Sequence, residues 1–224
     1  FGADFDPHLH SDWQLGKYKI TTTEQLQLNY SGKFELQIKA TNNAYGASIV
    51  APSKNGRPFN FTYKNVCLPV EVSIQHAGKA YQVKGNYGAI DFTKGYPPRE
   101  TIWNWLAFIG KTESGKEVGI NMVKHFNGDM ENVLWVNNQK TALSPGNFTM
   151  AKPIDKSPWH ITTNDGILDC TLVPNGARSE NVNALVLKSI FTQTYGKISG
   201  TLLLDGQKET FTAYGVGEDH HALW

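Results

Sequence analysis

The side chains best suited to chemistry are concentrated in one segment, Ile90–Trp105. It combines acidic and basic groups with large aromatic rings: Asp91, Lys94, Tyr96, Arg99, Glu100, Trp103 and Trp105. Ionised side chains are rarely buried without partners, so a segment built only for packing would not gather so many of them. We therefore expect this segment to line a pocket.

Proton transfer is the chemistry that these residue types indicate, with Asp91, Glu218 and His220 as candidate catalytic residues. A carboxylic acid packed against an indole ring is desolvated, which raises a carboxyl pKa and makes the group a proton donor near neutral pH. Glu218 and His220 lie two positions apart on a predicted strand, so they share a face and can form a general base. The structural alternatives are an ion pair of Asp91 with Lys94 or Arg99, and a solvated strand end at Glu218 and His220.

A second set of residues is expected to bind the substrate. Arg99 would hold an anionic or hydroxylated group, while Trp103 and Trp105 would form an apolar wall that excludes water. Buried amides offer donors and acceptors to a polar ligand, although they more commonly satisfy irregular backbone. The remaining candidates are Tyr96, Glu100, Asn121, Glu131 and Asn132.

Acidic and imidazole side chains alternate near the N-terminus, at Asp4, Asp6, His8 and His10. An extended segment would place all four on one face, where a transition metal could bind, but Pro7 and the terminal position favour a solvated edge. We predict neither a metal nor another cofactor. The sequence has no glycine-rich phosphate loop, Cys-x-x-Cys pair or Gly-x-Ser-x-Gly motif, which argues against nucleotide-binding, zinc-finger and serine-hydrolase classes.

Composition limits the kind of partner. The chain of 224 residues has 21 Lys and Arg against 20 Asp and Glu, so no overall field would draw it to nucleic acid or an anionic membrane. Its apolar runs are too short to span a bilayer, and the sequence shows no targeting segment, so we expect a soluble protein and predict no compartment. Oligomeric state is not predicted. Cys67 and Cys170 are expected to be buried free thiols rather than one disulfide.

Strand signals recur along the whole chain. Apolar and polar residues alternate in segments such as 33–39, 70–74, 167–173 and 197–204, and turn dipeptides such as Asp205-Gly206 separate them. The strongest helical candidate, Pro98 to Leu106, is short. We predict an all-β protein: an antiparallel β-barrel or barrel pair with short hairpins and few or no helices.

The expected domain boundary lies near residue 80. Residues 1–80 would form an N-terminal β segment or partial barrel, and residues 81–224 a C-terminal barrel, although both could belong to one continuous domain.

A series of motifs from about Phe61 to Trp224 resembles the DUF2804 family. Their order carries the resemblance more than any one of them: Phe61–Pro69, Gly88–Asp91 with Gly95, Trp103–Trp105, Gly119–Asn121, Glu131-Asn132, Trp159 with Thr162 and Asp165-Gly166, Gln193–Gly196 with Ser199-Gly200 and Asp205-Gly206, and Gly217-Glu218 with Trp224. The family has no assigned chemistry, but it is similar to the lipocalin-like hydratase group that includes carotenoid 1,2-hydratases. The resemblance therefore implies a lipocalin-like β-barrel or barrel pair.

Two departures from the family pattern indicate a divergent member. The family pattern has Asp-Trp-x-Arg-Gly where this chain has Asp91–Gly95, and it ends in Asn-Arg-Trp where this chain has Ala222–Trp224. We expect the substrate to differ accordingly.

The leading hypothesis is a lipocalin-like enzyme that uses carboxylate and histidine acid–base catalysis to add or remove water or alcohol across a C–O bond. Its substrate would be a small amphipathic molecule. One alternative is a non-catalytic protein of the same fold that binds a lipid or other amphipathic ligand. Another is a carbohydrate-active hydrolase or lyase, in which a sugar stacks on Trp or Tyr beside the same acids.

Overall fold

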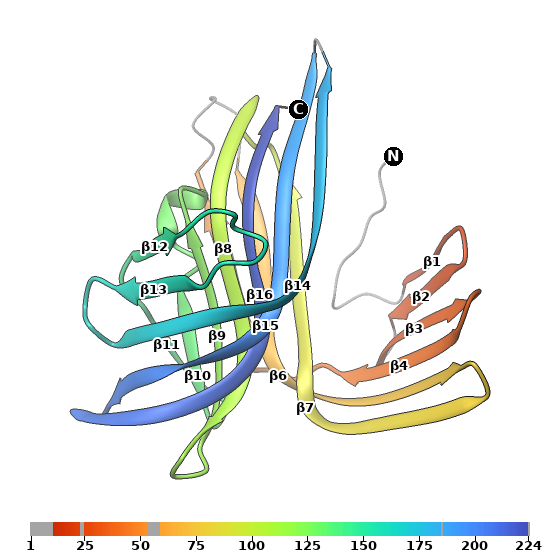
Figure 1. Cartoon of the computed structure of the whole chain (residues 1–224), viewed down its shortest axis with the longest axis horizontal. Helices are drawn as coiled ribbons and strands as arrows, with labels where there is room; N and C mark the ends of the chain where they lie inside the picture. The colour runs from red at the N-terminus through yellow and green to blue at the C-terminus, as the bar shows by residue number, and fades with distance from the viewer. Residues whose placement is uncertain (1–10, 23–24, 53–58, 185, 224) are drawn as a thin grey trace.

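The protein is built from two curled antiparallel β-sheets (Figure 1). The structure is a computed structural model that describes residues 11–22, 25–52, 59–184 and 186–223. Within these residues the only helical element recorded is a 3-10 turn, η1 (Asn127–Asp129). The predicted all-β antiparallel class is therefore confirmed. Asp4, Asp6, His8 and His10 lie outside the described residues.

The first sheet contains seven strands in the order β1-β2-β3-β4-β6-β5, and β7 pairs with the other edge of β6. The strands are β1 (Ser11–Leu15), β2 (Tyr18–Thr22), β3 (Gln25–Ser31), β4 (Glu35–Thr41), β5 (Ala47–Ala51), β6 (Asn60–His76) and β7 (Lys79–Gly95).

The second sheet contains nine strands in the order β11-β10-β9-β8-β16-β15-β14-β13-β12. The strands are β8 (Glu100–Thr112), β9 (Glu117–Lys124), β10 (Val133–Val136), β11 (Gln139–Ala142), β12 (Gly146–Met150), β13 (Trp159–Thr163), β14 (Leu168–Ala184), β15 (Leu187–Leu204) and β16 (Gln207–Leu223). Pro98 to Leu106, the helical candidate, instead leads into β8 and forms its first half. Asp205 and Gly206 both have positive φ, as a tight hairpin turn between β15 and β16 requires.

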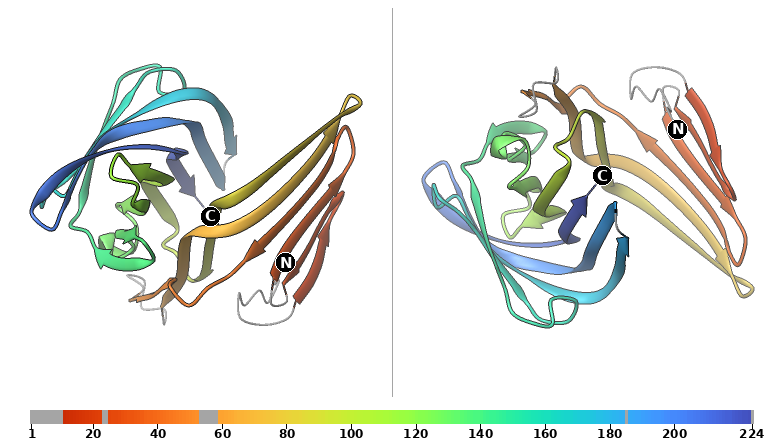
Figure 2. Two further views of the ribbon diagram at one scale, coloured as in Figure 1. Left: turned by 90° about the horizontal axis from the view of Figure 1, so that it is seen from below. Right: turned by 90° about the horizontal axis from the view of Figure 1, so that it is seen from above.

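The second sheet curls around its own apolar core (Figure 2). Leu106, Phe108, Trp159, Leu172 and Ile198 are among the fully buried residues of this core. Because side chains alternate across a strand, the neighbours of these residues point out of the opposite face of the sheet. That opposite face meets the first sheet around Val66, Cys67, Val133 and Trp135, which form a second apolar cluster.

A bend in the β6–β7 hairpin brings the two sheets together. The pairing of β6 with β7 shifts register between Asn65 and Leu68 and again between Leu68 and Val70. Such bulges bend a strand and increase its twist. As a result, the Asn60–Asn65 end of β6 and the paired end of β7 lie against the second sheet, while the other end of the hairpin extends away with β4 (Figure 1).

The division into domains near residue 80 stays a prediction. The β6–β7 hairpin spans that position, and the chain passes from the first sheet to the second between Gly95 and Glu100. No helix in the described part of the chain is long and apolar enough to cross a membrane.

The predicted burial of both cysteines as free thiols is confirmed. Cys67 and Cys170 are unpaired and lie in different apolar clusters. Burial raises the pKa of each thiol from its ordinary value of 9.0 to about 12, with smaller contributions from the negative charges of Glu117 and Asp169, respectively. Both thiols are therefore protonated and shielded at neutral pH.

We expect neither thiol to react with Ellman's reagent in the folded protein at about pH 8, and both to react after unfolding in urea. Because the folded pKa exceeds the unfolded one, the unfolded state binds fewer protons above about pH 9, so the free energy of unfolding should fall as pH rises there. In a Cys67→Ala/Cys170→Ala variant, the free energy of unfolding should fall less steeply with pH in this range. Rapid labelling of the folded protein would contradict this description of the two thiols.

Candidate functional site

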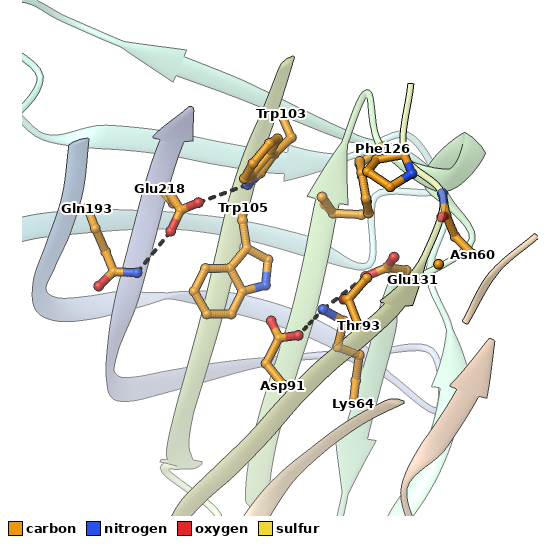
Figure 3. Close-up of a pocket in the computed structure, with 13 residues that line it drawn as sticks. Asn60, Lys64, Asp91, Thr93, Trp103, Trp105, Phe126, Glu131, Gln193 and Glu218 are labelled. Carbon is orange, nitrogen blue, oxygen red and sulfur yellow. Dashed lines mark hydrogen bonds and ion pairs between the residues drawn. The ribbon is translucent and has the colours of Figure 1, made fainter. Parts of the chain in front are cut away.

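A pocket of about 540 Å³ lies between the bent end of the β6–β7 hairpin and the outer face of the second sheet (Figure 3). Both sheets and two connecting segments contribute to it. Its lining residues are Asn60, Lys64, Asp91, Thr93, Gly95, Pro97, Trp103, Trp105, Val123, Phe126, Glu131, Gln193 and Glu218.

Strand register places the second sheet's contribution in one row. Gln193 pairs with Glu218, Glu218 with Trp105, and Trp105 with Val123, across β15, β16, β8 and β9. Directly paired residues project from the same face of a sheet, so this row forms one wall of the pocket. Gly217, next to Glu218, points the other way, because a side chain there would meet Leu172 and Trp159 in the core.

Register also builds the opposite wall. Lys64 pairs directly with Asp91, and Asn60 with Gly95, across β6 and β7. Asp91 and Glu218 thus come from different sheets, and in Figure 3 the Trp105 indole lies between them. The Glu218 carboxylate therefore lies on the side of the second sheet, and the Asp91 carboxylate on the side of the first.

Glu218 is nearly buried and accepts hydrogen bonds from its neighbours. The indole Nε1 of Trp103 and the amide Nε2 of Gln193 each donate to it at 2.9 Å. His220 Nδ1 lies 3.4 Å from the same carboxylate. The imidazole therefore lies beside this carboxylate.

The other ring nitrogen of His220 forms a hydrogen bond. Its Nε2 lies 3.1 Å from Ser189 Oγ. The imidazole also lies beside Trp103, with ring centroids 4.2 Å apart, and beside Phe191 at 5.1 Å. His220 is therefore held by Ser189 and packed against two aromatic rings.

Lys64 holds the opposite wall together. Its ammonium contacts Asp91 Oδ1 directly and lies 3.1 Å from Glu131 Oε2. The side chains of Lys64 and Glu131 are 6% and 1% exposed, whereas that of Asp91 is 39% exposed. A buried ammonium is thus shared between a buried carboxylate and one that reaches solvent.

The segment that carries Glu131 is held by two amides. Asn121 Nδ2 donates to the backbone oxygen of Glu131 at 2.9 Å, and Asn121 Oδ1 accepts from Trp105 Nε1 at 2.9 Å. Asn127 Nδ2 donates to the Glu131 carboxylate, and Asn60 Nδ2 donates to Asn127 Oδ1 at 3.1 Å. Asn121 therefore holds Trp105 and the segment that carries Glu131 together.

The structure brings many of the predicted site residues to this pocket. Asp91, Trp103, Trp105, Glu131 and Glu218 line it. His220 and Asn121 are bonded to lining residues, as described above. Asn132 is buried and accepts from the backbone N–H of Val123 at 2.7 Å, the backbone role considered as its alternative.

Besides Asn121 and Asn132, three more predicted substrate-binding residues lie outside the lining. Arg99 donates to the backbone oxygen of Val186 at 2.8 Å, and Glu100 pairs with His221 Nε2 at 2.7 Å. Glu100 is an odd number of positions from Trp103 and Trp105, so strand alternation turns it to the other face. Tyr96 lies in the connection between the sheets and is exposed.

Asn60, Lys64, Phe126 and Gln193 line the pocket but were not predicted. Asp91 does form an ion pair, but the described partner is Lys64 rather than Arg99. The available sequence signal was a lysine inside the apolar strand segment Phe61–Leu68, since a buried lysine needs a charged partner.

The two curled antiparallel sheets form a lipocalin-like fold, as expected. The chain belongs to DUF2804, a domain of unknown function, whose family model matches residues 14–224. No curated protein matches the chain by sequence.

Two solved structures share the fold. One is kievitone hydratase from Nectria haematococca, with a TM-score of 0.55 and 14% identity over 94% of this chain and 70% of that one. The other is a proposed AttH protein from Nitrosomonas europaea, with a TM-score of 0.52 and 12% identity over 92% of this chain and 68% of that one. At these identities the likeness shows the fold alone.

We predict that Lys64→Met will lower the free energy of unfolding by about 3–5 kcal/mol, because it leaves Glu131 buried without its cation. Adding Glu131→Gln should recover much of this loss. Urea denaturation of the wild type, both single variants and the double variant measures the interaction free energy between Lys64 and Glu131.

Lys84→Met is the matched control, because Lys84 pairs with Glu71 on the surface of the same sheet. We expect little change in its free energy of unfolding, because exposed ion pairs contribute little to stability. Equal effects of Lys64→Met and Lys84→Met would contradict the structural role assigned to Lys64.

Proposed function

We propose that this protein is a lipocalin-like enzyme that adds or removes water, or an alcohol, across a C–O bond of a small amphipathic substrate. The observation that carries the proposal is the placement of Asp91 and Glu218 on opposite walls of one pocket, on either side of Trp105. Hydration of a double bond needs a proton donor on one side and a base for water on the other. Two carboxylates on opposite walls of one pocket can fill both roles.

Glu218 and His220 supply the base in this mechanism. Glu218 is held by Trp103 and Gln193, and its carboxylate lies 3.4 Å from His220 Nδ1. In the direction of hydration, water loses a proton to this pair as its oxygen bonds to the substrate carbon. Fixed hydrogen bonds mean that little reorganisation is needed at that step.

Asp91 supplies the proton to the other carbon of the double bond. Lys64 stabilises the carboxylate that Asp91 becomes once its proton has moved to the substrate. Asp91 is also the member of the Lys64–Asp91–Glu131 cluster that reaches solvent, from which it regains its proton after each turnover. The Glu218–His220 pair releases to solvent the proton that it took from water. Dehydration would use the same groups with the opposite proton movements.

Trp103, Trp105 and Phe126 provide the apolar surface for an amphipathic substrate. Removing bulk water around the reacting carbons strengthens the electrostatic effects of nearby groups. The hydratase among the solved neighbours supports this reaction type, because it shows that the fold accommodates a hydratase.

A ligand-binding protein without catalysis is the second candidate. One observation favours it: each pocket carboxylate already has partners within the protein, with Lys64 on Asp91 and Glu131 and the Trp103 indole on Glu218. In that case the charges would maintain the pocket rather than transfer protons. Tight binding without turnover would support this candidate.

Screening paired alkenes and alcohols in ¹⁸O-labelled water tests the proposal. We expect incorporation of ¹⁸O by the wild type, and a loss of about 10²–10⁴-fold in kcat in Asp91→Asn and in Glu218→Gln, the range for removing general acid or base catalysis. Mass spectrometry of the product measures both the incorporation of ¹⁸O and the rate of turnover.

Asp169→Asn is the control, because Asp169 lies exposed on β14 and bonds to His160 away from the pocket. Its activity should match the wild type. If Asp91→Asn also retained wild-type activity, the acid–base mechanism would be wrong.

A further inference from the structure

A second hollow lies on the same face of the second sheet as the pocket. It is a groove of about 520 Å³ between β7 and the outer face of β8, β9 and β16. Ile109 and Lys111 line it, and both are an even number of positions from Trp105 on β8, so strand alternation places all three on the outer face. The volume falls within the range of small-molecule sites, about 300–1,000 Å³. No residue of this lining has a role in the proposed reaction.

Two exposed tyrosines line this groove. Tyr87 comes from the first sheet and Tyr214 from the second, and they are 60% and 68% exposed. The Tyr87 ring contacts the backbone at Gly85, where an added Cβ atom would come within 2.4 Å of the ring. Aromatic surface that two distant segments leave exposed at one groove indicates a ligand that covers it.

Polar groups lie beside these rings. Asn86 Nδ2 donates to Glu117 Oε1 at 3.0 Å and to Oε2 at 2.9 Å, which ties β7 to β9 and leaves Asn86 Oδ1 as an acceptor. Lys111 Nζ lies 3.9 Å from Glu117 Oε1, too far for a hydrogen bond, so its N–H groups are available as donors. Thr212 adds a hydroxyl group. The groove therefore offers both donors and acceptors.

These groups restrict the chemistry of the ligand. The charged lining residues are one carboxylate, Glu117, and one ammonium, Lys111, so the formal charge favours neither a cation nor an anion. A wholly apolar ligand would take the polar groups out of water without replacing their hydrogen bonds, which is costly. A sugar ring meets both conditions, because its hydroxyl groups donate and accept while its C–H face packs on an aromatic ring.

We propose that this groove is a binding site for a neutral sugar ring. The C–H face of the sugar packs against Tyr87 and Tyr214. Its hydroxyl groups bond to Glu117, Asn86 and Lys111.

The sugar site is separate from the pocket over Trp105. Tyr214 and Glu218 are four positions apart on β16, which corresponds to about 13 Å along the strand. The inference therefore does not depend on the proposed reaction.

Saturation-transfer NMR with the whole protein tests the proposal. The probes are the methyl glycosides of glucose, galactose, mannose, xylose and N-acetylglucosamine, each in both anomeric forms. We expect at least one to bind with a Kd of about 10 mM or tighter, and with the strongest transfer to the C–H protons of one ring face. Absence of binding by every glycoside would overturn the proposal.

Tyrosine variants locate the site. Tyr87→Ala and Tyr214→Ala should each weaken sugar binding about tenfold, because an aromatic contact is lost. Tyr81→Ala is the matched control, since Tyr81 lies on the same strand as Tyr87, is 52% exposed and lies outside the groove lining. It should bind the sugar as the wild type does. Unchanged binding in both groove variants, or an equal loss in Tyr81→Ala, would overturn the assignment.

Charged derivatives test the neutrality of the ligand. The 6-carboxylate and 2-amino derivatives of the best-binding glycoside should bind no more tightly than that glycoside itself. Tighter binding of either derivative would overturn the assignment of a neutral sugar.

Trp105→Ala separates this site from the proposed function, because Trp105 lines the pocket and not the groove. The variant should keep the wild-type affinity for the sugar. Sugar binding that is lost in Trp105→Ala and kept in Tyr214→Ala would place the sugar in the pocket and refute the groove site. Sugar binding that depends on Tyr214, without any turnover, would support the groove site alone. Turnover without sugar binding would support the enzyme and refute the groove site.

Discussion

The ion pairs of Lys64 are the interaction on which the site depends. The ammonium of this first-sheet residue lies between Asp91, on the paired strand, and Glu131, on a segment of the second sheet. Burying charge is costly unless the groups are paired and hydrogen-bonded, so these three side chains are constrained to stay together. Their pairing ties the bent end of the β6–β7 hairpin to the second sheet, and the pocket lies at that junction.

Other features of the site follow from this constraint. Glu131 orients Asn127, which orients Asn60, and Asn121 ties the Glu131 backbone to the Trp105 indole. The polar groups of the two walls are therefore part of a connected network, within which a single change affects several neighbours. The bulges in β6 have a functional consequence, because without the bend they produce, Lys64 and Asp91 would not face Trp105.

Local sequence patterns predicted where the strands lie better than they predicted which strands are neighbours in space. Alternation and turn dipeptides identified the strands, and the density of charged and aromatic residues identified Trp103, Trp105 and Asp91 as pocket residues. The same alternation, applied within β8, would have turned Glu100 away from the two tryptophans. The pairing of Lys64 with Asp91 depends on a hairpin register that contains bulges, and that of Glu218 with Trp105 joins strands more than a hundred residues apart. No local pattern encodes either pairing.

The central claim is that amphipathic ligands bind between the two sheets, over Trp105, rather than elsewhere on the fold. A crystal structure of the protein soaked with decanol tests this most directly. The account predicts electron density for the alkyl chain against Trp105 and Phe126. Density confined to another site, such as the groove lined by Tyr87 and Tyr214, would contradict it.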